Sequence, residues 1–167
     1  MVSECNIIGL GETAKQFNGK GITIGVNDAA HKWGLELDFL VLQDNPTNFT
    51  FERYQNIIDH PPKKMVITNQ AEWVESFKKN TKVEAWFFDQ YKILDSTFYA
   101  LLVASVLDFK DINIYGADFY HHPQLSQKIP QIIEQYNKYF LGKEDFFKIR
   151  VPKQSALSQC QNVTLID

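Results

Sequence analysis

The chain contains 167 residues, of which 44% are apolar and 22% are charged, and its formal net charge is −3. This length predicts a single domain over residues 1–167, large enough to bury a core without disulfides or a structural metal. The sequence has no block of Lys and Arg residues. We therefore expect no broad nucleic-acid binding, because such binding draws its affinity from neutralised phosphates.

The two cysteines, Cys5 and Cys160, lie near opposite ends of the chain and have no metal-ligand spacing. They indicate reduced thiols in a cytoplasmic protein rather than a disulfide framework or a zinc site. The sequence shows no signal-peptide pattern, and no apolar run approaches the ~18 residues that a membrane-spanning helix needs. We therefore expect no membrane span.

Short apolar runs alternate with longer amphipathic stretches along the chain. The runs predict strands at residues 5–9, 22–26, 38–42, 64–68, 83–88 and 111–115, with a last strand at 162–167. The stretches between them predict helices at residues 12–17, 28–33, 49–58, 71–79, 95–108 and 126–140. Continuous hydrophobic strands separated by helices are typical of a parallel sheet covered on both faces. The prediction is therefore an α/β domain of three layers, with a mainly parallel sheet of about six strands.

The stretch DSTFYALLVASVLDF, which begins at Asp95, is apolar nearly all round. Asp95 or Ser96 is a favourable N-cap for a helix. A helix without a polar face is usually buried on all sides. The sequence therefore predicts a buried central helix here.

The first predicted strand is followed by Gly9-Leu10-Gly11-Glu12-Thr13-Ala14, which matches the pattern Gly-x-Gly-x-x-(Gly/Ala). Between a strand and a helix, this pattern lets backbone N–H groups approach a phosphate at the helix N-terminus. The same spacing fits a tight turn that binds no ligand. Both interpretations remain open at this point.

Polar residues gather where the predicted strands end and where the buried helix begins. In a doubly wound sheet, ligands bind outside the carboxyl ends of the strands, so these residues predict a ligand site at one edge of the sheet. Polar residues at strand ends are also simply where loops begin. The residues are Gly9, Gly11, Glu12 and Thr13; Asn27 and Asp28; Gln43, Asp44 and Asn45; Asp95, Ser96 and Thr97; and Gly116, Asp118, Tyr120, His121 and His122.

The residues after the second predicted strand constrain the type of nucleotide. Asp28 lies close to the position where a dinucleotide site places the acid that holds a ribose. However, Asn27 comes first after the strand, and 167 residues leave little room for the second half of a dinucleotide site. A mononucleotide is therefore the better fit, with Glu12 and Asp28 as candidates for orienting ribose hydroxyls.

The pair His121-His122 has three open interpretations: a general base or phosphate contact, a metal ligand, and a pair of solvated loop residues. A histidine titrates near neutral pH without large tuning, which suits acid–base chemistry. Adjacent histidines point in different directions and have no His-x-His or His-x₃-His partner elsewhere. The segment Asp44-Asn45-Pro46 lacks the Asp-x-Asp of metal-dependent sugar transferases. We therefore expect no metal site and no required cofactor.

Several short islands of the sequence carry a resemblance to a known family. They are the glycine turn, Asn27 after the second strand, Asn45-Pro46-Thr47-Asn48-Phe49 after the third, and Ser96 with its helix followed by a strand and Gly116-Ala117-Asp118-Phe119-Tyr120. Through these islands, which fall between residues 5 and 120, the chain resembles the bacterial lipooligosaccharide sialyltransferases. It is also similar to their Rossmann-like relatives, the flagellin-glycosylation accessory factors and the archaeal hydroxymethylpterin diphosphokinases.

The resemblance implies a Rossmann-like fold and metal-independent glycosyl transfer from a nucleotide sugar. It assigns contacts with the cytidine monophosphate of the donor to Gly9, Gly11, Asn27, Asn45 and Ser96, and it gives Tyr120 the role of steadying the departing phosphate. This chain has Leu10 where the family has Asn, about Ile93 where it has Arg, and no His after His122. In an enzyme, His121 or His122 would then replace the late histidine base.

Two functions are consistent with these expectations. The first is a small glycosyltransferase-like protein that binds a nucleotide or nucleotide sugar at the carboxyl-terminal edge of the sheet. The alternative is a non-catalytic module that binds or sequesters a nucleotide. Both require a small-molecule nucleotide ligand as the partner, and both leave open the assembly of copies into a homo-oligomer.

Overall fold

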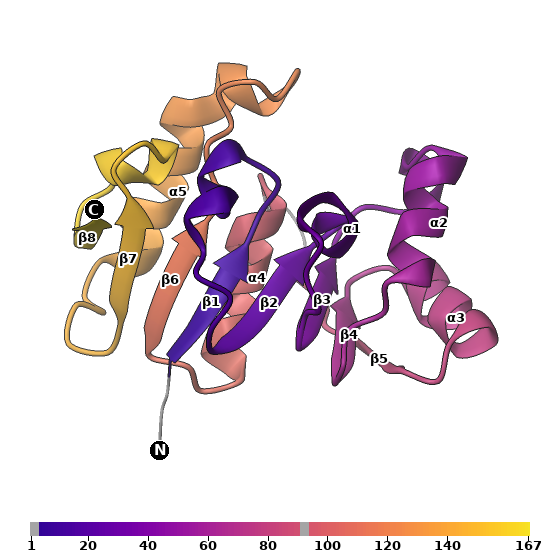
Figure 1. Ribbon diagram of the computed structural model, residues 1–167. Coiled ribbons are helices and arrows are strands. Elements are labelled where there is room, and N and C mark those ends of the chain that lie inside the picture. Colours follow the sequence, from indigo (N-terminus) through magenta and orange to yellow (C-terminus); the bar gives the residue numbers. More distant parts are fainter. Residues whose placement is uncertain (1–3, 91–93) are drawn as a thin grey trace.

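The computed structural model describes residues 4–90 and 94–167, so Ile93 lies outside the described residues. One sheet contains eight strands in the order β5-β4-β3-β2-β1-β6-β7-β8 (Figure 1), and all pairs of neighbouring strands are parallel. The strands are β1 (Glu4–Ile8), β2 (Ile22–Val26), β3 (Phe39–Leu42), β4 (Met65–Thr68), β5 (Glu84–Phe87), β6 (Asp111–Tyr115), β7 (Lys148–Pro152) and β8 (Val163–Ile166).

The strand order reverses once. From β1 the chain steps outward through β2, β3 and β4 to β5, and then crosses back so that β6 pairs with the other side of β1. The point between β1 and β6 is therefore the topological switch point, where an open α/β sheet leaves a crevice beyond its carboxyl ends.

Five α-helices and four short 3-10 helices connect the strands within the described residues. The α-helices are α1 (Ala29–Trp33), α2 (Phe51–Asp59), α3 (Ala71–Asn80), α4 (Ser96–Val106) and α5 (Ile129–Phe140). The 3-10 helices are η1 (Glu12–Gln16), η2 (Pro46–Asn48), η3 (Leu125–Lys128) and η4 (Ala156–Gln159). The predicted helix at residues 12–17 is therefore a 3-10 helix, and the one predicted at 126–140 is divided into η3 and α5.

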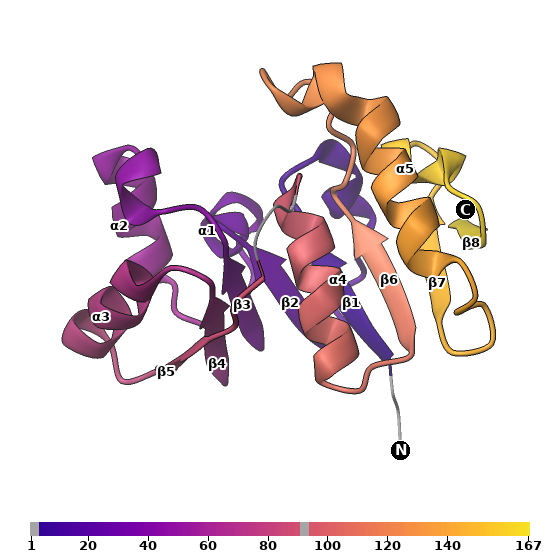
Figure 2. The ribbon, with the colours of Figure 1, turned by 180° about the vertical axis from the view of Figure 1, so that it is seen from behind.

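Apolar side chains from alternate strand positions form a separate core on each face of the sheet. One core joins Ile7, Ile24 and Ile114 to α4 and α5, which lie together on one face of the sheet (Figure 2). The other joins residues such as Leu40 and Ile8 to α1, α2 and α3. Seven of the eleven residues of α4 are buried, in agreement with the predicted buried helix, whereas Val106 at its end is exposed. The three layers and the parallel sheet are thus confirmed.

The predicted count of about six strands is wrong, because the sheet has eight. The terminal strand expected at 162–167 is confirmed as β8, whereas β7 was missed. In β7 only Ile149 and Val151 are apolar residues buried in the core, and charged Lys148 and Arg150 interrupt them. This short alternation is a weak strand signal beside the continuous apolar runs of the central strands.

Arg150 belongs to a polar network that crosses β1, β6 and β7 on one face of the sheet. Its guanidinium lies 3.3 Å from Asn113 Oδ1 and 3.5 Å from Asp111. The amide of Asn113 donates in turn to Glu4 and to Asn6 Oδ1. The network thus gives hydrogen-bond partners to the buried side-chain amides of Asn6 in β1 and Asn113 in β6. Buried polar groups need such partners because they have lost their hydrogen bonds to water.

Candidate functional site

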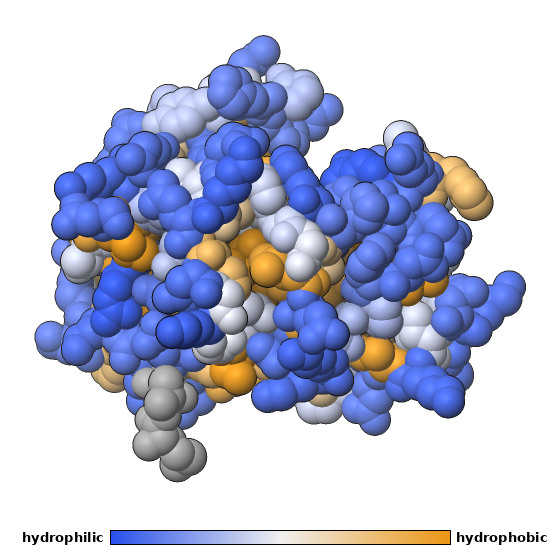
Figure 3. All heavy atoms as spheres, in the orientation of Figure 1, coloured by the Kyte–Doolittle hydropathy of each residue, from blue (hydrophilic) through white to orange (hydrophobic). Residues whose placement is uncertain are grey.

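A cleft of about 800 Å³ lies at the carboxyl-terminal edge of the sheet. Its walls come from the loops after β1, β2, β3, β4 and β6, from the first turns of α2 and α4, and from the segment that leads into η3. In the space-filling view the upper outline is notched between the part that carries α2 and the part that carries α5 (Figure 3). The cleft thus occupies the place where the topology leaves a crevice.

Most of the site residues predicted from the sequence line this cleft. They are Gly11, Glu12, Asn27, Asp28, Gln43, Asp44, Asp95, Ser96, Thr97, Gly116, Asp118, His121 and His122. Gly9, Thr13, Asn45 and Tyr120 are not among the lining residues. The structure therefore brings most of the predicted residues together, and their roles toward a ligand stay predictions.

The glycine turn lies against the loop that follows β6. Gly9 N donates to Tyr115 O at 2.7 Å, and Gly11 N donates to Gly116 O at 2.9 Å. A Cβ atom on Gly9 would lie 2.6 Å from Gly116 O. These glycines are therefore needed for the close approach of two backbones, in agreement with the interpretation as a tight turn.

Thr13 and Asp118 join the same two loops. Asp118 accepts hydrogen bonds from Thr13 N at 2.8 Å and from Thr13 Oγ1 at 2.5 Å. The Thr13 hydroxyl accepts in turn from Gly116 N at 2.8 Å. The glycine motif predicts that backbone N–H groups such as that of Thr13 bind a phosphate. In the structure this N–H is already bound to the Asp118 carboxylate.

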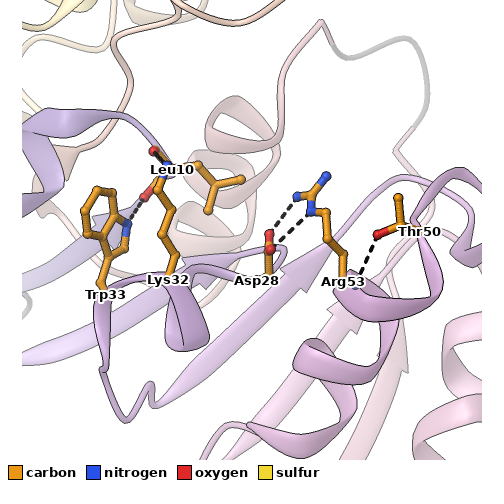
Figure 4. Close-up of polar contacts among 7 residues, drawn as sticks. Leu10, Asp28, Lys32, Trp33, Thr50 and Arg53 are labelled. Atoms are coloured by element: carbon orange, nitrogen blue, oxygen red, sulfur yellow. Dashed lines mark hydrogen bonds and ion pairs between the residues drawn. The ribbon is translucent and has the colours of Figure 1, made fainter.

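Helix α1 supports the glycine turn from the other side. Trp33 Nε1 donates to Gly9 O at 2.9 Å, and Lys32 Nζ donates to Leu10 O at 2.6 Å (Figure 4). Lys32 lines the cleft, and no carboxylate of the described residues lies within ion-pairing distance of it. Its ammonium group therefore keeps donors for a further acceptor. Lys32 is not among the predicted site residues, because the prediction covered only residues directly after strands and at the start of the buried helix.

Asp28 and Arg53 form a bidentate ion pair in the cleft wall. Arg53 Nη2 lies 2.6 Å from Asp28 Oδ1 and Arg53 Nε lies 3.1 Å from Asp28 Oδ2 (Figure 4). The hydrogen bonds to Asp28 raise the pKa of Arg53, and the guanidinium also lies over the Phe49 ring at 4.9 Å. A planar guanidinium held in this way suits recognition of phosphate or carboxylate.

Arg53 was also missed by the sequence analysis. It is the third residue of α2, whose N-cap Thr50 accepts from Arg53 N at 3.2 Å. The first turn of a helix that follows a parallel strand lies at the same sheet edge as the end of that strand. The Thr50 capping signal, combined with this rule, could therefore have placed Arg53 at the cleft.

Asn27 has an unusual backbone conformation between β2 and α1. Its φ angle is +52°, in the left-handed region, and its side-chain Oδ1 is buried without a hydrogen-bond partner in the described structure. Asparagine tolerates this region better than most residues, although a left-handed non-glycine residue still merits explanation. Strained residues with unpaired polar atoms cluster at ligand sites.

The loop after β3 is held mainly by contacts within the protein. Asn45 Oδ1 accepts from Thr47 N at 3.0 Å and so caps η2, and the Asp44 carbonyl accepts from Trp73 Nε1 at 2.7 Å. Gln43 Nε2 lies 3.4 Å from Ser96 Oγ, which connects this loop with the start of α4. Asn45 therefore has a structural partner, whereas Asp44 and Ser96 line the cleft.

His122 caps the segment that enters η3. Its Nδ1 lies 2.9 Å from Leu125 N and 3.1 Å from Gln124 N, so Nδ1 accepts hydrogen bonds and the neutral ring carries its proton on Nε2. Burial, and next the nearby charge of Arg53, lower the pKa of His122. In this arrangement His122 can donate a hydrogen bond from Nε2 into the cleft.

The lowered pKa of His122 predicts a pH effect on stability. The unfolded chain takes up the proton at higher pH than the folded chain, so this residue reduces the unfolding free energy as pH falls below about 6.5. We expect His122→Asn, which keeps a side-chain acceptor for the cap, to show a shallower loss of stability between pH 7 and 5. Urea denaturation at several pH values measures this, and identical slopes for the two proteins would contradict the prediction.

Tyr120 is not itself among the residues that line the cleft, although its chain neighbours Phe119 and His121 are. Its side chain is 48% exposed, and its hydroxyl lies 3.4 Å from Gln159 Nε2 in η4. Phe119, the residue before it, has a φ angle of +60° and does line the cleft. The role at a departing phosphate that the resemblance implies for Tyr120 stays a prediction.

The described part of the chain offers neither a cluster of metal ligands nor a membrane-spanning helix. Within residues 4–90 and 94–167, no group of three or more His, Cys, Asp or Glu side chains could hold a metal ion. Over the same residues, every helix is too short or too polar to cross a membrane.

No protein-family model matches the sequence, and no curated protein does either. The chain is similar to a solved structure of the sialyltransferase CstII from Campylobacter jejuni, in complex with the substrate analogue CMP-3FNeuAc. The sequence identity is 19% and the TM-score is 0.58, and the match covers 98% of this chain and 85% of CstII. A likeness at this identity shows the fold alone. The expected sialyltransferase-like α/β fold is thus confirmed, and the other relatives and the residue correspondences stay predictions.

Proposed function

We propose that this protein binds a nucleotide or a nucleotide sugar in the cleft at the carboxyl edge of its sheet. The observation that supports this most is the cleft itself. At the topological switch point, a volume of about 800 Å³ is lined by polar side chains from several strand ends and from α4. This is the position at which doubly wound folds bind nucleotides, and the volume is within the range of small-molecule sites.

The cationic and donor groups of the cleft suit the phosphates of such a ligand. Lys32 has no carboxylate partner among the described residues, Arg53 presents a guanidinium held by Asp28, and His122 has a proton on Nε2. The glycine turn contributes less than its motif suggests, because Gly9, Gly11 and Thr13 use their N–H groups within the protein. We therefore assign the phosphates to side chains rather than to this turn.

The fold shared with a sialyltransferase makes glycosyl transfer without a metal the reaction to test in this cleft. In that reaction His121 would take the proton of the acceptor, because His122 uses Nδ1 for capping and has its proton on Nε2. Tyr120 would have to reach the departing phosphate from its position near Gln159. The non-catalytic alternative needs only the cleft. Incubation with nucleotide sugars separates the two, since a binding module releases no free nucleotide.

We expect a nucleotide to raise the thermal stability of the protein. A ligand at a hundredfold excess over its Kd adds about 2.7 kcal/mol to the unfolding free energy. The measurement is a thermal-shift screen of nucleoside monophosphates, nucleoside diphosphates and nucleotide sugars. Arg53→Met should weaken binding of the best ligand by about tenfold, which corresponds to ~1.4 kcal/mol.

Arg150→Met is the matched control. Arg150 is also a partly buried arginine paired with an aspartate, Asp111, but it does not line the cleft. This variant should bind the ligand as the unchanged protein does. If no nucleotide shifts the melting temperature, or if both variants lose binding equally, the proposed function fails.

A further inference from the structure

Asp95 is a buried acid in the cleft wall that the proposed function has not used. It is the N-cap of α4, it is 1% exposed, and it is one of the residues that line the cleft. Its Oδ1 accepts hydrogen bonds from the Thr97 hydroxyl, from Phe98 N at 2.9 Å and from the Tyr136 hydroxyl at 3.1 Å. Helix capping therefore requires only one of its two oxygens.

The second oxygen, Asp95 Oδ2, is buried and has no hydrogen-bond partner in the described structure. No Lys, Arg or His of the described residues forms an ion pair with Asp95. Buried carboxylate oxygens without partners are rare in folded proteins, because each lost hydrogen bond to water has to be replaced. Asn27 Oδ1 is a second unpartnered oxygen among the residues that line the cleft. Both atoms are acceptors.

Among the described residues, the Lys and Arg side chains that line the cleft come from the opposite face of the sheet to Asp95. Lys32 belongs to α1 and Arg53 to α2, which pack on the opposite face from α4, where Asp95 lies. The phosphates of a nucleotide sugar pair best with the two cations. An uncharged part of the same ligand then faces the start of α4.

We propose that Asp95 Oδ2 accepts a hydrogen bond from a hydroxyl of the sugar in the bound nucleotide sugar, and that the cleft selects neutral sugars over carboxylated ones. This inference rests on the proposed function and adds the class of sugar. A sugar carboxylate at this place would set a second anion beside Asp95, which has no ion-pair partner among the described residues, and buried like charges repel strongly. A hydroxyl instead supplies the donor that Oδ2 lacks.

Burial raises the pKa of Asp95. A proton on this acid would go to Oδ2, because Oδ1 already accepts three hydrogen bonds. A protonated Oδ2 would donate and would tolerate a carboxylate, whereas the ionised form accepts from a hydroxyl. Asp95→Asn imitates the protonated form, since it retains an oxygen for the cap and replaces Oδ2 by an NH2 donor.

The test compares dissociation constants by calorimetry for two matched pairs: UDP-glucose with UDP-glucuronate, and GDP-mannose with GDP-mannuronate. Each pair differs only in a carboxylate at C6 of the sugar. For the pair that binds, we expect the unchanged protein to prefer the neutral sugar by tenfold or more. In Asp95→Asn the ratio of the two dissociation constants, carboxylated sugar to neutral sugar, should lie within about threefold of one. CMP-sialic acid is a third, carboxylated probe and should bind more weakly than the preferred neutral sugar.

Tyr136→Phe is the control for a purely structural role. It removes one donor to Asp95 Oδ1 and leaves Oδ2 unchanged, so the ratio should stay as in the unchanged protein even if the melting temperature falls. A ratio that is unaltered in Asp95→Asn overturns the inference. So does an equal loss for both members of a pair, or tighter binding of a carboxylated sugar. If none of these nucleotide sugars binds, or if they bind without discrimination, only this inference is overturned, whereas the proposed function fails when no nucleotide of the thermal-shift screen binds either.

Discussion

Replacing Gly116 by alanine is expected to lower the unfolding free energy by about 3 kcal/mol or more. Gly116 has a φ angle of +77°, and an added Cβ would lie 2.6 Å from the carbonyl carbon of Gly9 and 2.7 Å from its oxygen. The left-handed conformation costs a non-glycine residue about 1–2 kcal/mol, and overpacking typically adds 1–3 kcal/mol. Because the obstructing atoms belong to the backbone, a rotamer change cannot relieve the clash.

Gly19→Ala is the matched control for this experiment. Gly19 has nearly the same φ angle, +78°, but no atom lies within 4 Å of the position of its added Cβ. This variant should lose only about 1 kcal/mol, from the backbone conformation alone. Urea denaturation of both proteins gives the comparison. Equal losses would mean that the close approach of Gly9 and Gly116 does not hold the two loops together.

Replacing Asp118 by alanine is expected to cost about 3 kcal/mol of unfolding free energy. The change removes the acceptors of both Thr13 donors, so its backbone N–H and its hydroxyl hydrogen are buried without an acceptor, although the hydroxyl oxygen still accepts from Gly116 N. An unsatisfied buried donor costs about 1–3 kcal/mol. The loss should be smaller in the double variant with Thr13→Val than the sum of the single losses, because the two residues interact directly.

Asp111→Ala is the control for Asp118→Ala. Asp111 is partly exposed and forms a 3.5 Å ion pair with Arg150, so its loss should cost less than about 1 kcal/mol. Chemical denaturation of the unchanged protein, the two single variants Asp118→Ala and Thr13→Val, their double variant and Asp111→Ala measures these unfolding free energies. Strictly additive losses for Asp118→Ala and Thr13→Val would show that the two loops are joined by other contacts.

Secondary structure was predictable wherever the apolar pattern is strong. The run ITIGV forms β2 (Ile22–Val26) as expected, and the apolar stretch after Asp95 forms α4 (Ser96–Val106) with Asp95 as its N-cap. Apolar periodicity is a local property of the sequence, so it identifies elements without knowledge of their neighbours. It failed at β7, where Lys148 and Arg150 are accommodated by exposure and by a polar network rather than by an apolar core.

The sequence pattern indicates the edge of the sheet at which the candidate site lies, and the tertiary structure decides which polar groups remain available there. Polar residues after parallel strands must gather at one edge, which explains why Asn27, Asp28 and Ser96 line one cleft. Whether a polar atom is free depends on partners that are distant in the chain. The Thr13 amide donates to Asp118, which lies 105 positions later in the chain. Arg53 is 25 positions from Asp28, which orients it.

The sequence by itself determined the α/β class, the parallel sheet and the buried central helix, because hydrophobic period and capping act over a few neighbouring residues. Only the tertiary structure decided the strand order and the close crossing of Gly9 over Gly116. It likewise decided the exposure of Tyr120 and the unpartnered oxygen of Asp95. These features depend on contacts between segments that are distant in the sequence. Such contacts result from the packing of the whole chain, so they cannot be predicted from a local pattern of residues.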